Sequence, residues 1–166
     1  MQNKPPPSVN SAQQAVPSTR VLRQFRIVFN AVKTHFRSVE KAAGIGGAQL
    51  WALSVIQQQP GIGVNGLARE MDIHQTTASN LVKTLMTQGL IAQEKSSSDR
   101  RTVAMTLSAA GEESLRKAPM PFAGVLPDAL ASMDAATLSR LERDLSTLIL
   151  ALEAGNAGAD TPLSDL

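Results

Sequence analysis

Hydrogen-bonding side chains are concentrated between residues 75 and 83. Amide and hydroxyl groups both donate and accept hydrogen bonds, and a lysine among them adds a positive charge. On one face of a helix, such a set suits contacts with the base edges and phosphates of DNA. The candidate DNA-binding residues of this group are Gln75, Thr76, Thr77, Ser79, Asn80 and Lys83.

A second candidate group lies in the loop 96–101, between two segments that favour β-strands. The first segment starts at Leu90, and apolar residues alternate along the second, which ends at Leu107. The pattern predicts a β-hairpin whose tip carries charged side chains able to contact a DNA backbone or groove. The candidate DNA-binding residues at this tip are Asp99, Arg100 and Arg101.

Two predicted helices precede the hairpin and position the first group. A short helix over residues 67–71 and a turn at residues 72–73 lead to a helix that opens at His74, and Gly89 ends it because glycine tolerates a positive φ. Apolar residues of the second helix recur at steps of three and four, which buries one face. They are Ala78, Leu81, Val82, Leu85 and Met86.

Helix, turn, helix and hairpin follow one another without a break. This order predicts a winged helix-turn-helix over residues 42–107, in a mainly α (α+β) fold, whose second helix would enter the major groove of double-stranded DNA. The alternative from the same pattern is a helical hairpin followed by a β-hairpin, with no nucleic-acid partner.

Long helices with apolar stripes are predicted on both sides of this domain. Residues 18–41 and 135–153 each place apolar residues at alternating steps of three and four, and Asp134 is a suitable N-cap for the second helix. A winged helix does not need these stripes, so we expect residues 18–41 and 108–154 to form a helical dimerisation region. A homodimer would match a palindromic DNA site. The alternative is that the two helices pack on each other within one monomer.

The remaining segments are shorter. Helices are expected over residues 48–58 and 64–72, the second of which contains the short helix at 67–71. A fifth helix begins with Ser108 as its N-cap. Residues 1–17 and 155–166 are expected to be disordered tails. Three prolines should interrupt the fifth helix, namely Pro119, Pro121 and Pro127.

Charge is unevenly distributed along the 166 residues, although the net charge is only +2. Residues 1–41 carry seven basic residues and one acidic, residues 61–107 carry five and four, and residues 108–166 carry four and nine. A basic first part and an acidic last part favour one surface facing phosphate and another facing away from it. The alternative is ordinary solvated charge.

Several classes of protein are disfavoured by composition. The sequence has no cysteine and two histidines, so it contains no disulfide, and we expect neither a metal nor a cofactor. We find no apolar block typical of a signal peptide and no apolar run that could span a bilayer, so we expect a cytoplasmic protein without a membrane partner. Paired catalytic carboxylates, a nucleophile elbow and a Ser-His-Asp grouping are also missing, so we do not expect an enzyme.

Three segments together resemble the MarR family of transcriptional regulators, and the resemblance covers roughly residues 20–153. They are the helix at 67–71, the block from Thr76 to Ile91, and the wing from Asp99 to Gly111 with its Asp-x-Arg pattern. The resemblance implies a sequence-specific repressor or activator that binds DNA as an obligate homodimer. The alternative function is a winged-helix protein-interaction module without DNA binding.

The resemblance also implies roles for the wing residues. Arg101 would enter the minor groove, Asp99 would orient it by a charge-assisted bond, and Arg100 would lie alongside the DNA backbone. A guanidinium group suits the negative potential of a narrow minor groove. The chain departs from the family at Asn80, where a basic residue is frequent, and at the prolines that interrupt the fifth helix, which is usually long and continuous.

Members of the family often lose DNA affinity when a small phenolic or lipophilic anion binds between the dimerisation region and the winged helix. The resemblance therefore implies a possible small aromatic or lipophilic effector, with a histidine as its polar or titratable partner. The alternative is that the aromatic residues belong to the core. The candidate effector-binding residues are Phe29, His35, Phe36, Trp51 and Met120.

Overall fold

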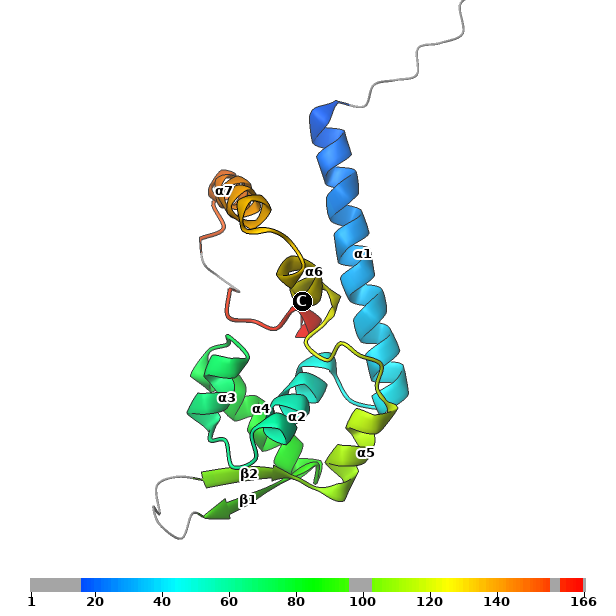
Figure 1. Cartoon of the computed structure of the whole chain (residues 1–166), viewed down its shortest axis with the longest axis vertical. Helices are drawn as coiled ribbons and strands as arrows, with labels where there is room; N and C mark the ends of the chain where they lie inside the picture. Colours follow the sequence, from blue (N-terminus) through cyan, green and yellow to red (C-terminus); the bar gives the residue numbers. More distant parts are fainter. Residues whose placement is uncertain (1–15, 96–102, 156–158, 166) are drawn as a thin grey trace, which may run out of the picture. The chain divides into compact units, whose positions relative to one another are not determined.

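The computed structural model describes residues 16–95, 103–155 and 159–165, with the side chains of residues 94, 95 and 103 excluded (Figure 1). The chain divides into two units, residues 1–30 and 31–166. The elements of the described residues, in chain order, are α1 (Pro17–Ala43), α2 (Gly47–Gln58), α3 (Val64–Glu70), α4 (Gln75–Thr87), β1 (Ile91–Lys95), β2 (Val103–Leu107), α5 (Ala109–Lys117), α6 (Val125–Ala131), α7 (Ala135–Ala151) and the 3-10 turn η1 (Leu163–Asp165).

The first unit consists, in its described part, of the N-terminal half of α1. Its apolar side chains are largely exposed, with Leu22 at 49% and Phe29 at 65% of full exposure. The rings of Phe25 and Phe29, one helical turn apart, stack with their centroids 6.0 Å apart. These residues form an apolar stripe, as the sequence predicts, but the described part of the unit does not bury it.

The core of the second unit is built around α2, which contacts α3, α4, α5 and β2 (Figure 1). Leu50 and Leu53 of α2, Leu67 of α3, Leu85 of α4 and Met105 of β2 are all inaccessible to solvent. Each such side chain contributes about 1.5–3 kcal/mol to folding by leaving water. Helices α3 and α4 are therefore fixed against α2, which leaves the other face of α4 available for a partner.

The hairpin follows α4, and Gly89, with a φ of +68°, ends that helix as predicted. Strands β1 and β2 are antiparallel, with Ile91 opposite Leu107. The predicted alternation is confirmed at Met105, which is fully buried, and Leu107, which is half-buried. The Met105 backbone also bonds the segment before α3, accepting from Gly61 N at 2.9 Å. The hairpin is thus attached to the winged helix along its second strand.

The region after the hairpin differs from the prediction in one element. Helix α5 begins with Ser108 as its N-cap, and Ser108 Oγ accepts from Gly111 N at 3.2 Å. It ends at Lys117, before the first of the prolines, as predicted. Pro127, however, does not interrupt a helix: it lies in the first turn of α6, where its missing N–H would have no helical partner. A short apolar segment that begins beside prolines carried no periodicity that could reveal α6.

Helix α7 has the predicted N-cap but no buried residue. Asp134 accepts hydrogen bonds from Thr137 N at 2.9 Å and from Thr137 Oγ1 at 2.7 Å. The leucine stripe of the helix remains partly exposed, with Leu145 at 36% and Leu148 at 37% of full exposure. In the described residues, no helix combines the length and apolar character needed to cross a membrane.

The last described segment, residues 159–165, is not the disordered tail that composition predicts. Pro162 is buried, and η1 packs against α2. Polar and small residues suggested disorder, but the burial of one proline against a distant helix is a tertiary contact that local composition does not reveal. At the other end, α1 already begins at Pro17, within the predicted tail 1–17, and residues 1–15 lie outside the described part of the chain.

Candidate nucleic-acid interface

A tight turn at residues 71–74 sets the angle between α3 and α4. Met71, inaccessible to solvent, caps the end of α3, and Asp72 adopts a φ of +50°. Asp tolerates this left-handed conformation better than most side chains because it is short and polar. Ile73 N then bonds Ala68 O at 3.0 Å, so the turn is closed by a backbone bond to α3. The helix-turn-helix is thereby held without any glycine in the turn.

His74 is the N-cap of α4. Its Nδ1 accepts a hydrogen bond from Thr76 N at 3.2 Å, which satisfies one of the free amides at the start of the helix. A ring nitrogen that accepts carries no proton, so in the neutral ring Nε2 is the donor. His74 is exposed, and this N–H is available to an acceptor in front of the helix.

The exposed face of α4 contains most of the first candidate group. Gln75, Thr76, Ser79, Asn80 and Lys83 are exposed, whereas Thr77 is half-buried. At 100° per residue, Thr77 lies roughly 100° from the line through Thr76 and Lys83, on the side that turns toward the core. The structure therefore brings five of the six predicted residues onto one surface and leaves Thr77 at its edge.

The buried face of α4 matches the prediction except at Met86, although Leu81 is only half-buried against the core. Ala78, Val82 and Leu85 are buried, but Met86 is 42% exposed. A step of 100° places Met86 about 70° from the centre of the buried line, so it falls at the boundary between the two faces. The simple rule of three and four steps does not resolve such a boundary residue.

Two further polar residues of the exposed face were missed. Thr84 and Thr87 are exposed and follow Asn80 and Lys83 by one helical turn. Thr84 Oγ1 donates to Asn80 O at 3.0 Å and Thr87 Oγ1 donates to Lys83 O at 2.9 Å. Because each hydroxyl hydrogen is used within the helix, both threonines offer only acceptor lone pairs to a partner. Their spacing of four from two predicted residues was the signal that could have identified them.

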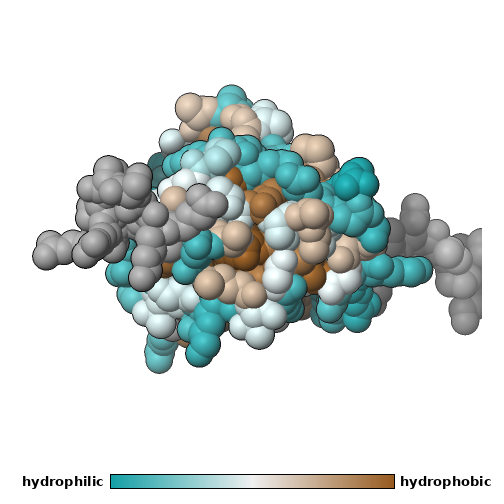
Figure 2. All heavy atoms as spheres, turned by 90° about the horizontal axis from the view of Figure 1, so that it is seen from below, coloured by the Kyte–Doolittle hydropathy of each residue, from teal (hydrophilic) through white to brown (hydrophobic). Residues whose placement is uncertain are grey.

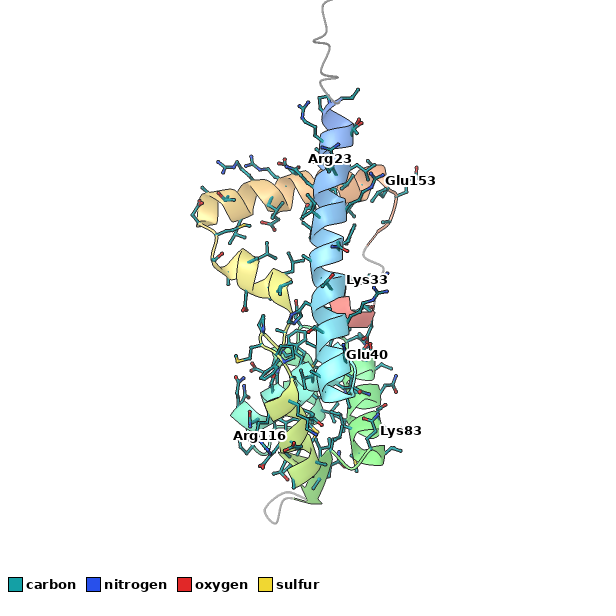
Figure 3. All side chains as sticks on the ribbon, turned by 90° about the vertical axis from the view of Figure 1, so that its right-hand side faces the viewer. Arg23, Lys33, Glu40, Lys83, Arg116 and Glu153 are labelled. Carbon is teal, nitrogen blue, oxygen red and sulfur yellow. The ribbon has the colours of Figure 1, made fainter. Side chains whose placement is uncertain are left out.

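Lys83 provides the positive charge of this face. In the described part of the chain, no carboxylate forms an ion pair with it. Figure 3 shows its side chain at one edge of the winged helix, while Arg116, which pairs with Glu113 within α5, lies at the other edge in that view. An unpaired ammonium group on an exposed helix suits a phosphate contact.

The wing residues Asp99, Arg100 and Arg101 lie outside the described residues. Lys95 is paired with Val103 at the ends of the two strands, so the hairpin fixes where the loop 96–102 starts and finishes. Seen from the hairpin side, hydrophilic residues dominate the rim of the molecule and apolar residues appear mainly in its middle (Figure 2). The roles of the three wing residues remain predictions from the resemblance.

The candidate effector residues are only partly brought together. Phe36 and Trp51 line a hollow of about 310 Å³. His35 is next to it: its Nε2 is 2.9 Å from Pro121 O, and its ring packs edge-on to Phe36 with centroids 5.4 Å apart. Met120 is 74% exposed and does not line the hollow. Phe29 belongs to the first unit and is also exposed.

Phe36 is held between two glycines. A Cβ added at Gly124 would fall 2.8 Å from Phe36 Cζ, and one added at Gly47 would fall even closer to the edge of the same ring. Such approaches are closer than side chains normally make, so the ring requires a residue without a Cβ on both sides. Phe36 is thus both a wall of the hollow and a packing element between α1, α2 and the start of α6.

The hollow contains few polar groups, and no grouping of His, Cys, Asp or Glu in the described residues could hold a metal ion. Its floor and walls include Met71 and Ile73, beneath the turn of the helix-turn-helix. The one charged side chain among its lining residues is Asp72, which also forms the turn before α4. The arrangement can bind an apolar compound by contact, next to the segment that orients α4.

Comparisons with known proteins identify the winged-helix segment. Residues 43–102 match the MarR family. Among solved structures, the S. aureus MepR–DNA complex matches with a TM-score of 0.55 and 17% identity over 82% of this chain and 99% of that one. Streptococcus pneumoniae FabT in complex with DNA matches with 0.51 and 18% over 82% and 98%. A MepR-like protein complexed with pseudoligands matches with 0.52 and 16% over 81% and 94%. No curated protein sequence matches.

Proposed function

We propose that the chain is a DNA-binding transcription regulator of the MarR family, whose model matches residues 43–102, and that it binds a palindromic operator as a homodimer. The observation that carries the proposal is the exposed face of α4, with Thr76, Asn80 and Lys83 in a row and a solvent-free core directly behind it. A helix fixed in this way can present its side chains to the major groove without first becoming ordered.

Different parts of the interface would have different tasks. Asn80 and Gln75 have the amide groups suited to base edges, while Lys83 and the His74 Nε2–H suit phosphates. In the wing, Arg101 would enter the minor groove, oriented by Asp99, with Arg100 along the backbone. MepR and FabT have been solved bound to DNA with the same fold, which supports this use of the winged helix.

The dimer part of the proposal is supported by α7. Leu145, Leu148 and Ile149 are 36%, 37% and 43% exposed and lie on one side of the helix. Leucine and isoleucine side chains at this spacing expose a continuous apolar surface to water unless another surface covers them. A second copy of the chain, supplying the same stripe, would cover it and place two α4 helices on one DNA site.

We also propose that the hollow binds a small aromatic or lipophilic effector that releases DNA. Its volume of about 310 Å³ falls at the lower end of the range for ligand pockets, and Phe36 and Trp51 supply aromatic surface. The carboxylate of Asp72 favours an uncharged or cationic compound over an anion. Because Asp72 also forms the turn before α4, a compound at this position would change the orientation of α4. The match to a MepR-like protein complexed with pseudoligands supports a ligand site in this fold.

Selection of bound DNA from a pool of genomic fragments tests the proposal. We expect enrichment of sequences with two inverted half-sites about one helical turn apart. Failure of the full chain to enrich any sequence would contradict DNA binding and would favour the winged-helix protein-interaction module.

A pair of variants tests the dimer separately. Leu148→Asp places a charge in the α7 stripe and should give a monomer that no longer retains the selected DNA. Leu150→Asp is the matched control, because Leu150 is 78% exposed and lies on the other side of α7. Light scattering after gel filtration measures the mass of both. A dimer that survives Leu148→Asp would refute the assignment of the interface to this stripe.

A further inference from the structure

Residues 159–165 return to the winged helix and form one side of the hollow. Thr161, Pro162, Leu163 and Ser164 all line it, together with Phe36 and Trp51. In Figure 1 this segment is the red turn beside the C label.

Several contacts hold the segment in place. Pro162 is buried, and Asp165 N donates to Pro162 O at 2.9 Å, which closes the turn η1. Ser164 lies so close to α2 that a Cβ added at Gly47 would fall 2.8 Å from Ser164 Cβ. The absence of a side chain at Gly47 is therefore needed both for the Phe36 ring and for this segment.

The segment also changes the chemistry of the hollow. Its other lining residues are apolar apart from Asp72, whereas Thr161 and Ser164 add two hydroxyl groups. Leu163 remains 38% exposed, so the segment is seated by one buried proline and its neighbours and not by a large apolar area. A contact of this size can open without unfolding the domain behind it.

We propose that residues 159–165 are an intrachain lid on the effector site, which limits the hollow to small compounds and must move aside for a larger one. The existence of the lid rests on the contacts above, whereas its role in regulation rests on the proposed effector function. With the lid closed, Trp51 is half-buried and the hollow has its present volume. With the lid open, Trp51 and Phe36 form an exposed aromatic surface.

Trp51 is the one tryptophan of the sequence, so its fluorescence reports on the lid directly. We expect a variant lacking residues 159–165, and the variant Pro162→Glu in the full chain, to roughly double the quenching of Trp51 by acrylamide, because both open the lid. Both variants should also bind the uncharged aromatic probe N-phenyl-1-naphthylamine more strongly than the unchanged chain. Asp160→Asn, at an exposed position within the same segment and outside the lining of the hollow, is the matched control and should leave both signals unchanged.

Other measurements separate the possible failures. Unchanged Trp51 quenching in both folded variants would overturn the lid. Hydrogen exchange on the unchanged chain gives a test that does not depend on variant folding, since the lid requires protection of the Asp165 amide. If acrylamide quenching of Trp51 in the unchanged chain increases on dilution, a second copy supplies the segment and the intrachain lid is wrong. If no compound releases DNA while quenching behaves as expected, the lid stands and the effector function fails.

Discussion

Replacing Lys83 by alanine should make DNA binding less sensitive to salt. Each lysine that contacts a phosphate releases a condensed counterion, which steepens the fall of log K with log salt by about 0.9. Lys83 is exposed, and no carboxylate of the described residues forms an ion pair with it. Two copies in a homodimer should therefore reduce the slope by about 1.8, twice 0.9.

The same figures predict how the affinities change. Between about 50 and 200 mM salt, a fourfold range, a slope difference of about 1.8 reduces the advantage of the unchanged chain about 12-fold. If only one copy contacts the DNA, the slope difference of about 0.9 gives a reduction of about 3.5-fold. The experiment thus distinguishes a dimeric from a monomeric complex as well as testing the contact.

Fluorescence anisotropy with a labelled operator, titrated at several salt concentrations, measures the slopes. Lys117→Ala is the matched control, because this substitution also removes one positive charge. Lys117, however, lies on α5, where its Nζ pairs with Glu113 Oε1 at 3.3 Å. Its slope should equal that of the unchanged chain. Equal slopes for Lys83→Ala and the unchanged chain would refute the phosphate contact and, with it, the proposed placement of α4 on DNA.

Two further predictions concern stability. Leu85→Ala should lower the free energy of unfolding by about 2–5 kcal/mol because Leu85 is inaccessible to solvent. The neighbouring Met86→Ala, at a 42% exposed position, should change it by less than about 1 kcal/mol. Urea unfolding measures both free energies, and equal effects would contradict the assigned faces of α4. Hydrogen bonds from the Thr137 hydroxyl and amide hold the pKa of Asp134 below its ordinary value. The stabilisation that Asp134→Ala removes should therefore be present at neutral pH and disappear as pH falls through the lowered pKa. Thermal unfolding across acidic pH measures this, and a stability difference between the two chains that does not change with pH would exclude the charged cap.

The sequence predicts the winged helix well because its signals are local. Apolar steps of three and four, Gly89 at a positive φ and Ser108 as a cap each act within a few residues, and each has the expected role in the structure. The exposed face of α4 followed from the same periodicity. The exposure of Thr77 and Met86 was misjudged because both lie at the boundary between the buried and exposed faces of α4. At such a boundary, a small rotation of the helix decides whether a side chain is buried.

The hollow and its lid could not be predicted in the same way. Phe36 and Trp51 meet there because α1, α2 and residues 159–165 converge, and no local pattern relates positions so far apart in sequence. Met120 has the right type of side chain, yet it points to solvent after the prolines end α5. Composition alone also gave no indication that Pro162 would be buried.

The position of Phe36 between Gly47 and Gly124 has a consequence for how this molecule can vary. When a large core residue is shortened, neighbouring side chains usually shift to fill part of the space, which reduces the cost. Two glycines have no side chains that can shift, so the ring works as a spacer that sets the distance between two backbones. A smaller residue at position 36 would leave a gap that only movement of whole helices could close, and changing the spacing here would require compensating changes at all three positions together.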